Sequence, residues 1–219
     1  RSVDKICHRM ELGKDTYTLG KIRPEMEEEL CRVLADFVRI MEGYRVDDYR
    51  ATASSAISEA SNSLYVLGKI HQLTGLSVTV LSNSEQRFLS YKALAAMEDN
   101  FNKIIEKGTA ILDLDGGSFQ ISLFDKDALV TTQNIRMGSL RIRERLAGIQ
   151  SETEHYEEMV EELIWNEVSS FKKMYLKDRK IENIMLIGDV FTDSVYQNIE
   201  EKTTKIISRE NFNTWYEKI

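Results

Sequence analysis

The 219-residue sequence predicts a mixed α/β fold in two parts. In the first part, stretches with a helical spacing of apolar residues alternate with short β-rich runs, which is typical of a layered α/β domain. In the second part, three apolar β-like runs are separated only by short turns at 115–117 and 125–127, which predicts an antiparallel meander. The boundary is expected near Lys107, with domains of residues 1–107 and 108–219.

The first part is expected to open with a strand over 3–12 and a loop that runs to Arg23. A helix should begin at Pro24, because proline suits the first helical position and the glutamates that follow stabilise the positive end of the helix dipole. Gly43 is expected to end this helix. Further helices are predicted over 61–73 and 84–97, with a short segment at 49–55 and a β-rich run at 76–81.

The meander of the second part is expected over 109–114, 119–124 and 128–135. A long helix should follow, because the apolar residues from Tyr156 to Met174 keep one stripe that is long enough to cover a sheet. A buried strand over 183–187 and a last helix over 209–219 complete this part.

Composition and charge exclude several classes of protein. The formal net charge of −7 argues against a dedicated nucleic-acid binder, because phosphate backbones are captured by clustered Lys and Arg. No stretch approaches the roughly 20 apolar residues that span a bilayer, so no membrane partner is expected. Cys7 and Cys31 lack metal-site spacing, so neither a zinc site nor a disulfide framework is implied, and a reducing cytoplasm is the expected location.

The run from Leu112 to Leu123 is the segment that most resembles a chemical site. It reads as a strand, a tight glycine turn with a serine, and a second strand. Backbone N–H groups in such a turn can surround a phosphate, because glycine has no Cβ to block the approach. Asp113 could hold a divalent cation through water, as Mg²⁺ prefers. An ordinary Asp-Gly-Gly hairpin explains the same residues.

Several segments resemble one known family. Residues 113–121, DLDGGSFQI, resemble the DIGGGSTEL phosphate loop of the exopolyphosphatase/guanosine-pentaphosphate phosphatase (Ppx/GppA) family. Residues 53–62, ASSAISEASN, resemble its ATSAIREAxN segment, and residues 74–86, TGLSVTVLSNSEQ, its TGxxIxVISGxEE segment. Residues 137–144, MGSLRIRE, are similar to its LGAVRLTE stretch, and residues 184–189, IMLIGD, to its later glycine turn. The matches keep the order and spacing of the family across nearly the whole chain.

The resemblance implies two actin-like (ribonuclease-H-type) domains with mixed sheets that flank a cleft. It implies hydrolysis of the terminal phosphoanhydride of polyphosphate or guanosine pentaphosphate by Mg²⁺-assisted attack of water, with Asp113 as the metal ligand. The sequence leaves open whether the chain forms a homodimer. By the same resemblance, the phosphate-binding positions are Ser58, Asp115, Gly116, Gly117, Ser118 and Gly188.

Several positions depart from the family pattern. Ser58 stands in place of a phosphate-binding arginine, and Asp115 and Asp189 stand in place of glycines. Gln86 replaces the glutamate that activates water in the family, and Gln120 replaces the glutamate of the phosphate loop. A carboxamide cannot accept a proton, and a positioned general base contributes about 10²–10⁴ in rate.

The resemblance therefore implies a hydrolase that is impaired or inactive. Glu85 could turn inward and act as the base, and Gln86 could orient water without deprotonating it. The alternative is a non-catalytic relative that binds a phosphorylated ligand or a partner protein; a sugar kinase of the same fold is less expected. An arginine cluster around Gly138 could receive an anion: Arg136, Arg141, Arg143 and Arg145.

The resemblance also implies that both ends are incomplete relative to the family. No segment before Cys7 resembles the family's first phosphate loop, Asp-x-Gly-Ser-Asn-Ser, and no segment resembles its final strand and helix.

Overall fold

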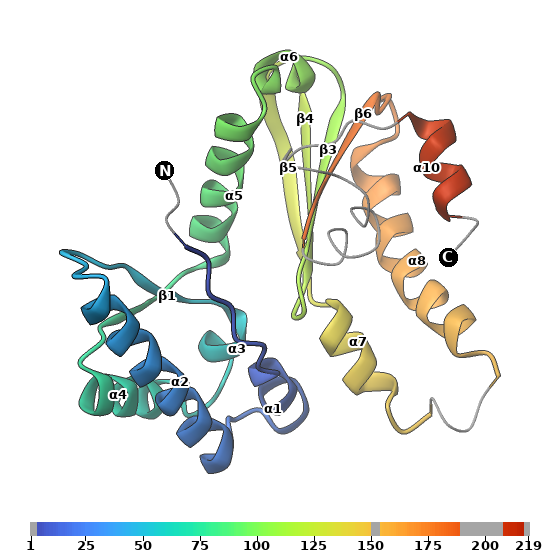
Figure 1. Cartoon of the computed structure of the whole chain (residues 1–219). Coiled ribbons are helices and arrows are strands. Elements are labelled where there is room, and N and C mark those ends of the chain that lie inside the picture. The colour runs from blue at the N-terminus through green and yellow to red at the C-terminus, as the bar shows by residue number, and fades with distance from the viewer. Residues whose placement is uncertain (1–3, 150–153, 189–207, 217–219) are drawn as a thin grey trace.

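The structure is a computed structural model that describes residues 4–149, 154–188 and 208–216. Two groups of elements face each other (Figure 1). We call residues 4–82 the first unit. Its elements are α1 (Leu12–Leu19), α2 (Pro24–Gly43), β1 (Ala51–Ala53), α3 (Ser55–Ser58), α4 (Ser63–Thr74) and β2 (Val78–Val80).

The second unit consists of the described residues from 83 onward. Its elements are α5 (Asn83–Met97), α6 (Phe101–Ile105), β3 (Thr109–Leu114), β4 (Phe119–Asp125), β5 (Ala128–Ile135), α7 (Ser139–Leu146), α8 (Tyr156–Tyr175), β6 (Asn183–Ile187) and α10 (Arg209–Tyr216). By packing, α5 and α6 lie with the second sheet although they precede the predicted boundary near Lys107. The last residues of the helix predicted over 209–219 lie outside the described residues.

The second unit is built on the predicted meander, which is confirmed. The strand order is β5-β4-β3-β6, with β3, β4 and β5 antiparallel and β6 parallel to β3. Helix α6 packs on one face against Ile111 and Phe124, and α8 packs on the other face through Phe171. Strand β4 is central and is buried from Phe119 to Phe124 except at Gln120.

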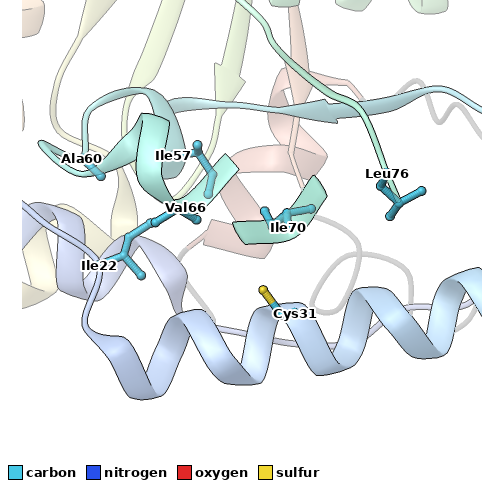
Figure 2. Close-up of a cluster of buried hydrophobic side chains, with 7 residues drawn as sticks. All are labelled: Ile22, Cys31, Ile57, Ala60, Val66, Ile70 and Leu76. Carbon is cyan, nitrogen blue, oxygen red and sulfur yellow. The ribbon is translucent and has the colours of Figure 1, made fainter. Parts of the chain in front are cut away.

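The first unit has a two-stranded parallel sheet, β1-β2, whose side chains share a hydrophobic core with α2 and α4. Because the apolar residues of α2 recur at helical spacing, one face of this helix packs against α4 and the two strands. Figure 2 shows the resulting core. It consists of Ile22, Cys31, Ile57, Ala60, Val66, Ile70 and Leu76.

The strand predicted over 3–12 is wrong for the described residues, and the loop predicted up to Arg23 is confirmed only at residues 20–23. Residues 4–11 form no regular element, and α1 occupies the predicted loop. Gly20 ends α1 in the left-handed conformation at φ 70°, and its N–H donates to Thr16 O. The buried side chains of α1 are polar, and only Leu12 at its start packs against the hydrophobic core, so the segment lacks an apolar stripe. Asp15 and Thr16 are both buried, and Thr16 Oγ1 donates to Ala56 O at 2.6 Å.

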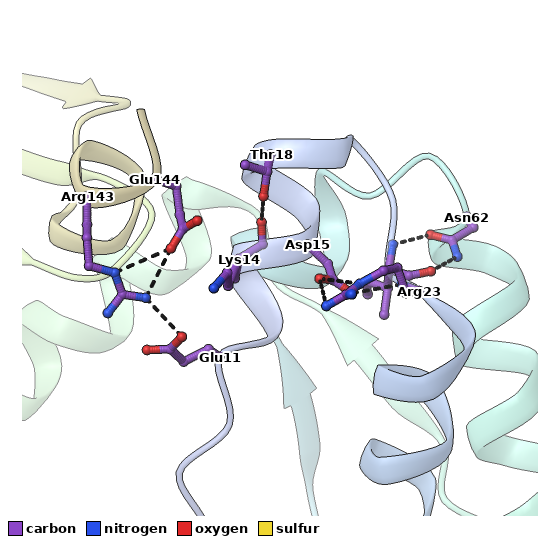
Figure 3. Close-up of polar contacts among 9 residues, drawn as sticks. Glu11, Lys14, Asp15, Thr18, Arg23, Asn62, Arg143 and Glu144 are labelled. Atoms are coloured by element: carbon purple, nitrogen blue, oxygen red, sulfur yellow. Dashed lines mark hydrogen bonds and ion pairs between the residues drawn. The ribbon is translucent and has the colours of Figure 1, made fainter. Parts of the chain in front are cut away.

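A polar network fastens α1 to the rest of the first unit. Asp15 accepts hydrogen bonds from the backbone N–H and from Nε of Arg23, both at 2.9 Å. Asn62 exchanges two hydrogen bonds with the backbone of Ile22 (Figure 3). Asn62 also donates to Glu27, which Lys69 contacts at 3.3 Å. The buried carboxylates are therefore paired, as buried charges must be.

Within the described ranges, no helix combines the length and the apolarity that crossing a membrane requires.

Candidate phosphate-binding site

The turn of residues 115–118 joins β3 to β4 and faces the first unit. The Asp115 N–H donates to Ser118 O at 3.1 Å, which closes the turn. Oδ1 of Asp115 accepts hydrogen bonds from the backbone N–H groups of Gly117 and Ser118, each at 2.7 Å. The turn therefore carries its own anion: a carboxylate occupies two of the donors that the sequence offered for a phosphate.

Gly117 and Gly138 lie so close to neighbouring atoms that neither position has space for a side chain. A Cβ on Gly117 would lie 2.2 Å from Tyr17 Oη and 2.8 Å from Ser55 Oγ, both in the first unit. A Cβ on Gly138 would lie 2.4 Å from both Asp115 O and Ser118 N. Gly117 is therefore packed against the first unit and Gly138 against the backbone of the turn, whereas Asp115 stays exposed.

Helix α7 holds the backbone of the turn. Its first N–H groups have no partners within the helix, and two of them reach carbonyl oxygens of the turn. The Ser139 N–H donates to Asp115 O at 3.2 Å, and the Arg141 N–H donates to Gly116 O at 3.0 Å. These donors are therefore used for structure and are not directed at a ligand.

Asp113 lies at the end of β3, opposite Gln120 on β4. Its Oδ2 accepts a 2.9 Å hydrogen bond from Ser90 Oγ of α5. Burial raises the pKa of Asp113; the Ser90 hydroxyl lowers it in part, and the charge of Asp115 raises it further. The sequence had assigned Asp113 as a metal ligand and Gln120 as a catalytic position, and the register places them side by side.

The described residues do not form a metal site from protein groups alone. No three His, Cys, Asp or Glu side chains gather in the part of the chain that the structure describes. One oxygen of Asp115 is already bonded to the turn. Asp113 can therefore hold Mg²⁺ only together with water and the oxygens of a phosphate ligand, which is a common arrangement for this ion.

Glu85 and Gln86 are both engaged at the start of α5. Glu85 and Ser82 form a capping box, in which the Glu85 carboxylate accepts from the Ser82 N–H and hydroxyl, both at 2.8 Å. The backbone bond to Ser82, and then its hydroxyl, lower the pKa of Glu85. Gln86 Nε2 donates to Leu81 O at 3.2 Å. A carboxylate with a lowered pKa is a poor general base, so Glu85 is placed to cap the helix.

Of the remaining predicted positions, Gly188 lies beside the turn and Ser58 does not contact it. Gly188 lies beside it, since a Cβ there would be 2.4 Å from Leu114 O and its φ of 138° suits glycine. Ser58 is exposed at the end of α3, and Ser55 at the start of that helix contacts the turn instead. Asp189 lies outside the described residues.

Sequence reasoning missed three residues of the first unit that reach the turn or its arginine: Tyr17, Ser55 and Glu59. Tyr17 fell in a predicted loop, and Ser55 and Glu59 flank the predicted position at Ser58. Two signals were available: the family-like segment 53–62, which contains Ser55 and Glu59, and the arginine cluster, from which the structure selects Arg141. Arg141 Nε donates to Gly117 O at 2.8 Å.

Comparison with known proteins agrees with this architecture. The bifunctional 3-dehydroquinate synthase/phosphatase of Fusobacterium nucleatum is 21% identical over 211 residues, which are 92% of this chain and 30% of that protein. The structure of an exopolyphosphatase from Cytophaga hutchinsonii matches with a TM-score of 0.73 at 20% identity, over 94% of this chain and 68% of that one. The Aquifex aeolicus Ppx/GppA family member matches with a TM-score of 0.67 at 19% identity, over 94% and 66%.

The sequence thus spans 30% of the Fusobacterium nucleatum protein and about two thirds of the two solved structures named above. Structural likeness at this level of identity shows the fold, an α/β architecture of the actin-like type with mixed sheets, as the sequence predicted. A protein-family model described as the Ppx/GppA phosphatase family matches residues 2–219. Because that match covers nearly the whole sequence, the chain belongs to the Ppx/GppA phosphatase family.

Proposed function

We propose that this chain is a Ppx/GppA phosphatase whose ligands are phosphate chains, either polyphosphate or guanosine pentaphosphate, and whose hydrolytic activity is impaired. The ligand class is supported by family membership and by the name of the Cytophaga hutchinsonii relative, an exopolyphosphatase. The impairment is supported by the site itself. Mg²⁺ is the proposed cation, held by Asp113 with oxygens of the ligand. The homodimer and the cytoplasmic location stay predictions.

The observation that carries the proposal is the position of the Asp115 carboxylate. It accepts from the Gly117 and Ser118 N–H groups at 2.7 Å, so a phosphate must displace an anion that is covalently attached to the turn. A hydrogen bond to a charged group contributes about 1.5–3 kcal/mol to stability, and each 1.4 kcal/mol is tenfold in affinity. The internal carboxylate therefore weakens phosphate binding by at least about tenfold.

One observation favours the alternative, a relative that binds phosphate chains without hydrolysing them. The two side chains at the start of α5 are both bonded locally, Glu85 to Ser82 and Gln86 to Leu81 O. Neither is poised to take a proton from water. Binding therefore requires only that the turn open, whereas hydrolysis also requires a base.

The test is phosphate release from polyphosphate and from guanosine pentaphosphate with Mg²⁺, together with calorimetric binding of both ligands. Asp115→Gly restores the family glycine and frees the two N–H groups. We expect this variant to bind at least about tenfold more tightly than the wild type. Higher affinity with no release would support the binding protein, and higher affinity with faster release would support the impaired hydrolase.

Asp127→Gly is the matched control. Asp127 lies in the turn between β4 and β5, at the other end of the meander, and its φ of 62° suits glycine. This variant loses the same charge without touching residues 115–118, so its affinity should equal that of the wild type. A wild-type release rate equal to that of an intact family exopolyphosphatase, unchanged by Asp115→Gly, would contradict the proposed impairment.

A further inference from the structure

Arg141 is the side chain that contacts both units at the turn. Its Nε donates to Gly117 O at 2.8 Å, and its Nη2 lies 2.8 Å from Glu59 Oε2 of the first unit. Its guanidinium stacks 4.0 Å from the centre of the Tyr17 ring, and Tyr17 Oη is 3.0 Å from Ser55 Oγ. One cation thus links the turn to α1, α3 and the residue after α3.

The position of Arg141 beside the turn does not depend on Glu59. Its backbone N–H donates to Gly116 O and its side chain to Gly117 O, so two bonds within the second unit hold it there. The guanidinium is planar and has five N–H donors, which suits bidentate contact with a carboxylate or a phosphate. Release from Glu59 would leave a cation with free donors next to the turn.

Two carboxylates therefore occupy the two groups of anion donors at this place. Asp115 occupies the N–H groups of the turn, and Glu59 occupies the guanidinium. The Arg141 and Glu59 side chains are only 22% and 28% exposed, so solvent screens their attraction less than that of a surface pair. A ligand with two or more linked phosphates could replace both carboxylates, whereas a single phosphate could replace one.

A neighbouring ion pair provides an internal comparison. Arg143, also on α7, contacts Glu11 of the first unit at 2.9 Å and Glu144 at 3.1 Å (Figure 3). The pair of Arg143 and Glu11 also joins the two units, but its side chains are more exposed than those of Arg141 and Glu59. Among the described residues, the side chain of Arg143 bonds to Glu11 and Glu144 and not to the turn. Breaking the Arg143–Glu11 pair therefore tests whether a weaker contact between the units is enough to change phosphate binding.

We propose that Arg141 is the cation that binds a phosphate chain at this site and that its ion pair with Glu59 is a latch, for which the ligand competes. This inference rests on the proposed ligand class and adds its regulation: phosphate binding exchanges Glu59 for a phosphate at Arg141 and loosens the contact between the units. Ser58 stands in place of a family arginine, whereas Arg141 matches the arginine of the family's LGAVRLTE stretch and so keeps a cation beside the turn from the opposite unit.

The experiment is a calorimetric titration of the protein with inorganic tripolyphosphate in the absence of metal. Glu59→Gln removes the competing charge while keeping the shape of the side chain, and should tighten binding at least about tenfold. Arg141→Gln should weaken binding by a similar factor, and the double variant should behave like Arg141→Gln alone. Arg141→Lys keeps the charge but lacks the planar guanidinium that binds bidentately, so its affinity should fall between those of the wild type and Arg141→Gln.

Glu11→Gln is the control, because it frees Arg143 from the neighbouring pair, and its affinity should match that of the wild type. Equal tightening by Glu11→Gln and Glu59→Gln would overturn the latch, since opening of the units alone would explain it. Unchanged affinity in Glu59→Gln would also overturn it. Thermal unfolding of each variant confirms that the comparison is made on folded protein.

The same titration separates this inference from the proposed function. Tighter binding in Asp115→Gly, with no effect of Glu59→Gln or Arg141→Gln, would leave the site in place and reject the latch. No response to any of the three substitutions would reject the site and, with it, the proposed ligand class. Absence of binding to the wild type, to Asp115→Gly and to Glu59→Gln at millimolar tripolyphosphate would reject both.

Discussion

The hydroxyl of Ser90 donates a 2.9 Å hydrogen bond to Asp113 and so ties helix α5 to the end of β3, two residues before the turn. Asp113 is half-buried, so this bond compensates part of its lost hydration. Ser90→Ala should destabilise the protein by about 1–3 kcal/mol, measured by urea unfolding. Ser84→Ala, an exposed serine of the same helix, should stay within about 0.5 kcal/mol of the wild type. Equal losses would mean that the bond to Asp113 adds nothing specific.

The ion pair of Asp15 and Arg23 makes stability depend on pH. The Asp15 side chain is 2% exposed, and that of Arg23 is 52% exposed. Burial raises the pKa of Asp15, but its hydrogen bonds and charge interaction with Arg23 outweigh burial, and the net pKa is lowered. A carboxyl with a lowered pKa contributes stability that is present above its ordinary value of 3.8 and is lost as the pH falls through the lowered value.

Asp15→Asn should therefore destabilise the protein at pH 7 by about 3 kcal/mol, at the low end for breaking a buried pair, because Arg23 can be solvated. The difference from the wild type should shrink as the pH falls below the ordinary value of 3.8. Asp36→Asn, which breaks an exposed pair with Arg39 on α2, is the matched control and should not shift the midpoint measurably. A deficit that stays constant over the acid range would argue against the charge of Asp15 as its source.

Gln86→Glu tests the missing base. With Asp115→Gly to open the turn, we expect phosphate release to rise by a factor on the order of 10². Gln86→Glu alone should change little, because the turn stays occupied by Asp115 and the new carboxylate loses the bond to Leu81 O. Gln72→Glu, an exposed residue of α4, provides the same chemical change elsewhere. A wild-type reaction that is already fast would mean that Gln86 does not mark a missing base.

Gly138 is required by close packing against the turn. A Cβ would lie 2.4 Å from Asp115 O and from Ser118 N and 2.5 Å from the carbonyl carbon of Gly116, all of them backbone atoms that cannot move aside cheaply. Gly138→Ala should cost more than about 2 kcal/mol and abolish tripolyphosphate binding. Gly68→Ala is the control, since a Cβ in the middle of α4 meets nothing within 4 Å. That variant should gain about 0.5–1 kcal/mol from helix propensity.

Local patterns were sufficient where an element's own residues decide its type. The helix predicted from Pro24 to Gly43 has those bounds, and the strand predicted over 183–187 has its bounds too. The prediction that this strand is buried is wrong for the described residues, because β6 lies at the end of the strand order and Ile184 is 63% exposed. The turn chemistry at 115–117 and 125–127 likewise separated three strands correctly. Helix α1 was missed because its buried positions are polar, and polar residues are buried only when partners such as Arg23 and Ala56 O satisfy them.

The sequence by itself determined the fold class, the family and the residues of the turn, because these depend on periodicity, turn residues and motif order. Only the tertiary structure decided which groups occupy the anion donors. Arg141 and Glu59 are separated by 82 residues, and the stacking of Tyr17 on Arg141 joins α1 to α7. The side-chain torsions of Asp115 place its carboxylate on the N–H groups of its own turn. The contacts of Arg141 depend on the packing of the two units against each other, which no local pattern of residues records. The contact of Asp115 is local to its turn, and the structure shows that it is formed.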